Sequence, residues 1–193
     1  MIPEYFAGLG IALEILGGLY YLYCTIKGSV RPNRVTYFFW TVIPMIAFAA
    51  QIVQGVGLVA WMTFAAGLTP LLILIASTFN PDAFWKTRKI DFVFAGIAIV
   101  GLILWYITDN PNFAITFAIL AEIAVVAPTL VKTYQFPETE AWASYGLSLL
   151  GYGLVLLSIQ TWTYENYAFV TTLFVTTLLI TVFALRKPSE ERI

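Results

Sequence analysis

The sequence has no histidine and a single cysteine, Cys24, among its 193 residues. The absence of histidine excludes histidine zinc ligands, histidine general bases and histidine-ligated haem. One cysteine forms no disulfide within the chain. Carboxylates are then the remaining metal-binding side chains. We expect no metal site and no cofactor.

Charged residues are also scarce, at 11% of the chain against about 25% in an ordinary soluble domain. The formal net charge is −1, and no block of lysine and arginine indicates a nucleic-acid surface. The sequence also contains no phosphate-binding loop, nucleophile elbow or redox pair. These absences exclude nucleic acid as a partner and predict that the protein is not an enzyme.

Apolar residues are what the chain has in excess: 60% are hydrophobic and 17% aromatic, and they fall in long runs. A soluble fold of this size cannot bury so much apolar surface, and the strands of a membrane barrel would alternate apolar and polar residues. The sequence predicts an all-α membrane protein. About twenty apolar residues cross a bilayer, and we expect seven transmembrane helices, at residues 5–26, 37–54, 58–79, 92–108, 112–131, 142–160 and 166–185.

Every basic residue falls on one side of the membrane if all seven runs are spans. The opposite side then carries only Glu4, Asp109 and Glu165. By the positive-inside rule, the N-terminus lies outside and the C-terminus in the cytoplasm of a plasma (inner) membrane. The basic residues are Lys27, Arg31, Arg34, Lys86, Arg88, Lys89, Lys132, Arg186, Lys187 and Arg192.

An internal repeat emerges when the chain is shifted by about 105 residues, which places Lys27 on Lys132 and Pro32 on Pro137. Because one span separates the copies, both insert in the same direction, as in transporters built from parallel repeats. We therefore expect a 3+1+3 arrangement. Its parts are a first three-helix repeat (1–79), a linker loop with an inversion helix (80–111), a second three-helix repeat (112–185) and a cytoplasmic tail (186–193).

The segment Ala-Pro-Thr-Leu-Val-Lys-Thr at 127–133, followed by Pro-Glu-Thr-Glu-Ala-Trp-Ala-Ser at 137–144, resembles the PQ-loop/SWEET superfamily of small seven-span transporters. The resemblance implies the 3+1+3 fold and a hinge at Pro128 near the cytoplasmic gate. The sequence departs from the family at Thr129, where the family has glutamine. It also lacks the mid-membrane asparagine of the sugar-carrying members.

Two acidic residues, Glu14 and Glu122, lie nine or ten residues into the first and fifth runs. That depth is about 14 Å along a helix, near the membrane midplane. A carboxylate there is costly and by default marks a functional site. In a parallel repeat both would face one cavity. Either at least one is protonated, which favours proton-linked transport, or a cationic ligand supplies the missing charge. The alternative is a neutral acid that joins neighbouring helices by hydrogen bonds.

Small and aromatic residues follow Glu14 on the same helix. Gly17 and Gly18 lie one turn further on, where they either make room for a substrate or allow close helix packing. Tyr21 shares the face of Glu14 and is the aromatic residue that we expect in the pocket. We include all of these with the two glutamates as candidate substrate-binding residues.

Prolines interrupt three of the predicted spans. Pro44, Pro70 and Pro128 each remove a helix hydrogen bond, and each is a candidate gating hinge. A static kink is the alternative, since proline is tolerated in membrane helices without gating anything.

Together these features predict a small-solute membrane transporter that works by alternating access around a midplane site with two carboxylates. We expect the transport to be proton-linked or its substrate to be a cationic or polar solute. The alternatives are a receptor or sorting protein on the same fold, or a structural membrane protein without transport. The expected partners are the solute or proton and the lipid bilayer, and association between copies of the chain stays open.

Overall fold

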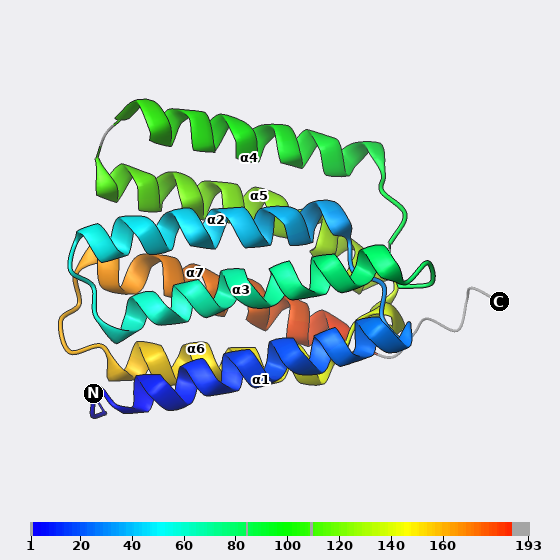
Figure 1. Cartoon of the computed structure of the whole chain (residues 1–193), viewed down its shortest axis with the longest axis horizontal. Helices are drawn as coiled ribbons and strands as arrows, with labels where there is room; N and C mark the ends of the chain where they lie inside the picture. The colour runs from blue at the N-terminus through cyan, green and yellow to red at the C-terminus, as the bar shows by residue number, and fades with distance from the viewer. Residues whose placement is uncertain (1, 84, 109, 187–193) are drawn as a thin grey trace.

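The computed structural model of the protein describes residues 2–83, 85–108 and 110–186, which form helices and connections without a strand in those ranges (Figure 1). The elements are α1 (Phe6–Lys27), α2 (Arg34–Val53), α3 (Leu58–Phe79), α4 (Lys89–Thr108), α5 (Pro111–Gln135), a short 3-10 helix (Pro137–Thr139), α6 (Trp142–Ser158) and α7 (Tyr164–Ala184).

Each of the seven apolar runs forms one helix. Within the described residues, α1, α2, α3, α5 and α7 are long and apolar enough to cross a membrane, and the apolar helix α6 is shorter, at 17 residues. The described residues are all-helical as predicted, and their long apolar helices are consistent with an α-helical membrane protein. The largest departure from the predicted ends is in α5, which continues to Gln135. Lys132, expected after the span, therefore lies inside the helix.

Polar and conformationally special residues end the helices where the apolar runs stop. The Asn33 side chain accepts hydrogen bonds from the backbone N–H groups of Val35 and Thr36 and so caps the start of α2. Gly28 ends α1 with a φ of +73°, in the left-handed region that favours glycine. The Asn110 side chain caps the start of α5 by accepting a hydrogen bond from the Asn112 N–H group.

The helices run up and down in chain order, and α3 lies between α1 and α2 (Figure 1). In the same manner, α7 packs against both α5 and α6. These two groups of three meet mainly where α1 packs on α6 and α2 on α5, with smaller contacts that include α3 with α7, while α4 packs mainly on α5. The site described below lies where the two groups meet.

The C-terminal ends of α1, α3, α5 and α7 lie at the same end of the bundle, which we call the basic end (Figure 1). The described lysines and arginines lie at or near it, in the last turns of these helices, in the connections and in the first turns of α2 and α4. Asp109 and residues 187–193, with Lys187, Arg192 and most of the predicted tail, lie outside the described residues.

The contact between α1 and α6 is unusually close because glycines face each other across it. A Cβ atom built on Gly10 would lie 2.6 Å from the carbonyl oxygen of Gly151, and one on Gly151 would lie 2.5 Å from that of Gly10. Further along, the Ser144 hydroxyl donates a hydrogen bond to the Gly17 carbonyl oxygen at 2.7 Å. Small residues thus let the two backbones touch, as is typical of helix contacts in membranes.

Candidate functional site

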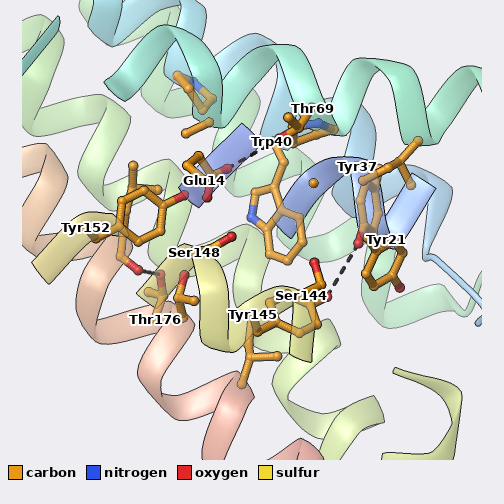
Figure 2. Close-up of a pocket in the computed structure, with 18 of the residues that line it drawn as sticks. Glu14, Tyr21, Tyr37, Trp40, Thr69, Ser144, Tyr145, Ser148, Tyr152 and Thr176 are labelled. Atoms are coloured by element: carbon orange, nitrogen blue, oxygen red, sulfur yellow. Dashed lines mark hydrogen bonds between the residues drawn. The ribbon is translucent and has the colours of Figure 1, made fainter. Parts of the chain in front are cut away.

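A cavity of about 70 Å³ lies between the two groups of helices. A water molecule occupies about 30 Å³ in the liquid, so this space suits a few waters or a small solute. Its lining comes from α1, α2, α3, α5, α6 and α7 and combines two glutamates, hydroxyl side chains and aromatic rings (Figure 2). Of the described residues that line it, none is a lysine or an arginine.

Glu14 of α1 is one of the two carboxylates in this lining, and 4% of its surface is exposed. Its Oε1 accepts a hydrogen bond from the Thr69 hydroxyl of α3 at 3.3 Å. Ser148 and Tyr152 of α6 lie beside the same carboxyl group (Figure 2). Its Oε2, however, is buried without a direct hydrogen-bond partner. The Glu14 carboxyl group is therefore surrounded by three hydroxyl groups, and its Oε2 accepts no close hydrogen bond from them.

Glu122 of α5 is the second carboxylate of the cavity and is 2% exposed. Its Oε2 makes no close hydrogen bond, and neither does the indole Nε1 of Trp40, which lies beside this carboxyl group in the same cavity. The Tyr152 hydroxyl interacts electrostatically with Glu14 and with Glu122. Oε2 of each glutamate therefore makes no close hydrogen bond, which is uncommon for buried polar atoms.

Three tyrosines line the end of the cavity that faces the basic end of the bundle. The Tyr21 ring centroid lies 5.5 Å from that of Tyr37 and 5.8 Å from that of Tyr145. The hydroxyls of Tyr37 and Tyr145 are 3.4 Å apart. Tyr21 and Tyr145 both donate to Oε2 of Glu140, at 2.7 and 2.9 Å. The cavity is thereby connected to a buried carboxylate in the connection between α5 and α6.

Glu140 is neutralised by a buried lysine. The Lys132 Nζ lies 2.5 Å from Oε1 of Glu140, and both side chains are at most 2% exposed. Lys132 also donates to the carbonyl oxygen of Arg31, and the Arg31 N–H donates to the Thr139 carbonyl oxygen at 3.0 Å. The connections after α1 and after α5 are thus joined to each other above the tyrosines. We call Lys132, Glu140, Tyr21 and Tyr145 the polar plug.

The structure brings six of the predicted site residues to this cavity: Glu14, Gly18, Tyr21, Pro44, Pro70 and Glu122. Gly17, expected to bind substrate, instead packs against α6, where an added Cβ would lie 2.7 Å from the Ser144 carbonyl oxygen. Pro128, the expected hinge, is buried in α5 outside the lining.

Sequence reasoning missed most of the aromatic lining and the role of Glu140. The sequence spacing does contain a signal for part of it. Glu14 and Glu122 are 122 − 14 = 108 residues apart, and the contacting pair Tyr37 and Tyr145 is also 108 apart. The offset of about 105 residues was derived from matching residues at the connections, so it does not align these pairs within the helices.

No family model matches the chain, and neither a curated protein nor a solved structure matches it significantly. The similarity to the PQ-loop/SWEET superfamily therefore rests on the sequence motif alone.

Proposed function

We propose that the protein is a small-solute transporter of the plasma (inner) membrane, with seven spans in a 3+1+3 arrangement. The observation that carries the proposal is that Glu14 and Glu122 line one cavity. None of the described residues that line it is a lysine or an arginine. Intramembrane carboxylates that face a cavity typically mark a substrate or proton pathway. In this proposal the protein moves a solute across the membrane and is not an enzyme.

The packing of the helices supports the two-repeat arrangement. If α1, α2 and α3 correspond to α5, α6 and α7, the contact of α1 with α6 corresponds to that of α5 with α2, and both contacts are made. The 108-residue offset pairs Glu14 with Glu122, Tyr37 with Tyr145 and Thr69 with Thr177, and all six of these residues line the cavity. A midplane site at the interface of two repeats is the common design of secondary transporters.

The polar plug is the proposed gate at the cytoplasmic side. The positive-inside rule assigns the basic end of the bundle to the cytoplasm, and the plug lies between this end and the cavity. Opening on this side requires the connections after α1 and α5 to separate and the Tyr21 and Tyr145 hydroxyls to leave Glu140. Alternating access then exposes the two glutamates first to one side and then to the other.

Accessibility of the cavity tests this proposal without knowledge of the solute. Because Cys24 is the sole cysteine, Cys24→Ser gives a cysteine-free background. In that background we expect Ser148→Cys, in the cavity lining, to react with a membrane-impermeant methanethiosulfonate added to either side of oriented proteoliposomes. The measurement is the fraction of protein modified over time.

The matched control is Ala47→Cys on α2, a fully buried position in the apolar core outside the cavity lining, which should stay unmodified. Modification of Ser148→Cys from one side only would contradict alternating access. Its protection from both sides would favour a structural protein without transport.

Pro128 provides a second test on the same background. If its missing backbone hydrogen bond lets α5 bend at the gate, Pro128→Ala should slow modification of Ser148→Cys from the cytoplasmic side about fivefold or more, which corresponds to about 1 kcal/mol in the barrier. Modification from the outer side should change little. Unchanged rates on both sides would make the proline a static kink.

A further inference from the structure

The cavity has the chemistry of a site for a positively charged solute. It contains two carboxyl groups, and no lysine or arginine is among the described residues that line it. An ionised carboxylate in an apolar interior is strongly unfavourable unless a positive charge accompanies it. Among the described residues, Lys132 is the buried lysine near the cavity, and it is already paired with Glu140. When Glu14 or Glu122 is ionised, its counter-charge therefore has to come from outside the chain, whereas a protonated carboxyl group needs none.

The unused atoms of the cavity match hydrogen-bond donors on such a solute. Oε2 of Glu14 and Oε2 of Glu122 are buried acceptors without a partner. A carboxylate accepts N–H bonds, which are stronger when the donor is charged. The Thr69 hydroxyl lies 3.3 Å from the other oxygen of Glu14 and shares its proton between that oxygen and the Ala65 carbonyl oxygen at 3.2 Å.

Aromatic rings complete the lining and favour an organic cation over a metal ion. Tyr21, Tyr37, Trp40 and Tyr145 line one part of the cavity (Figure 2), and the faces of such rings attract ammonium and guanidinium groups. A hard metal ion would instead need six or more oxygen ligands at short range. Within the described part of the chain, no group of three or more acidic, cysteine or histidine side chains is arranged to hold a metal.

We propose that Glu14 and Glu122 bind a small organic monocation with N–H donors, of the amine or guanidine class, whose apolar or planar part lies against the Trp40 and tyrosine rings. The size of the cavity, about 70 Å³, restricts the solute in this conformation to a few heavy atoms. This inference rests on the proposed transport function and names the substrate class of the same site.

Guanidinium and urea form a matched pair of probes, because they have nearly the same shape and differ in charge. We expect guanidinium chloride at millimolar concentrations, where its denaturing effect is negligible, to raise the melting temperature of the purified protein. The rise should be about 3–6 °C at ten times the dissociation constant. Urea and sodium chloride at the same concentrations should cause no rise.

The double variant Glu14→Gln, Glu122→Gln should lose this response, while Glu4→Gln, the same change at an exposed position, should keep it. The single variants serve if the double variant does not fold. An equal shift with urea would overturn the charge requirement, and an equal shift with sodium would overturn the organic class. A response that survives in the glutamine variants would overturn the site, and no response to guanidinium or methylammonium would overturn the proposal.

The cation-binding experiment and the accessibility experiment can fail independently of each other. Two-sided modification of Ser148→Cys without any response to cations would leave a transporter of another solute class. A response to guanidinium in a protein whose cavity opens to one side only would leave a cation-binding protein that does not transport.

Discussion

Lys132→Met should destabilise the protein by about 3–5 kcal/mol, the usual cost of removing one partner from a buried ion pair. Methionine roughly keeps the length of the side chain but leaves Glu140 buried without its counter-charge 2.5 Å away. The hydroxyls of Tyr21 and Tyr145 would still donate to Glu140, but they do not neutralise it. The free energy of unfolding, from denaturation of the purified protein in detergent, is the measurement.

The double variant Lys132→Met, Glu140→Gln should recover most of this loss, because it removes both charges of the pair. Lys27→Met is the matched control, since Lys27 is exposed at the end of α1, and it should change stability by less than about 0.5 kcal/mol. If Lys132→Met were no more harmful than Lys27→Met, the ion pair would not hold the connections of the two helix groups together.

Gly10→Ala and Gly151→Ala should each destabilise the protein by about 1–3 kcal/mol, the typical cost of overpacking. The added methyl group would lie 2.6 Å or 2.5 Å from a backbone carbonyl oxygen of the facing helix. A backbone atom cannot turn aside as a side chain can, so α1 and α6 would have to separate. Thermal denaturation of the single variants in detergent, compared with the unmodified protein, is the measurement.

Each of these glycines has a control on its own helix. A Cβ atom on Gly8 of α1 or Gly146 of α6 would meet nothing within 4 Å. Gly8→Ala and Gly146→Ala should therefore be neutral or stabilising by up to about 1 kcal/mol, because alanine favours the helix more than glycine does. Equal effects at all four positions would mean that helix propensity, and not the close contact, governs stability there.

The polar plug and the cavity share two side chains, those of Tyr21 and Tyr145. Tyr21 and Tyr145 line the cavity and at the same time donate to Glu140. In the proposed mechanism, a solute that reorients either ring also weakens the contacts that close the cytoplasmic side. Glu14 and Tyr21 are 21 − 14 = 7 residues apart on α1, about two helical turns, so binding at Glu14 would favour opening over a short distance.

The helices themselves were determined by the sequence alone. Long apolar runs with few charged residues have to satisfy their backbone hydrogen bonds internally in a membrane, which leaves the helix as the local structure they form. Asn33, Gly28 and Asn110 mark helix ends because their side chains or their conformational freedom suit those positions. The two glutamates were also evident, because a carboxylate in an apolar run is conspicuous.

The partners of those residues were decided only by the tertiary structure. Tyr37, Trp40, Tyr145 and Tyr152 are ordinary aromatic residues in an aromatic-rich sequence, and only the packing of α2 and α6 against the opposite group of helices brings them to one cavity. Nothing in the local sequence distinguishes them from aromatic residues at the membrane surface.

The environment of Lys132 was likewise decided by the tertiary structure. The sequence placed Lys132 just after the fifth predicted span, yet it is buried within α5. Glu140 lies only eight residues further along the chain, but their pairing depends on the fold of the connection and on the Arg31 carbonyl oxygen from the other group of helices. Local patterns fix where a helix forms, whereas the neutralisation of a charge depends on atoms that only packing brings within reach.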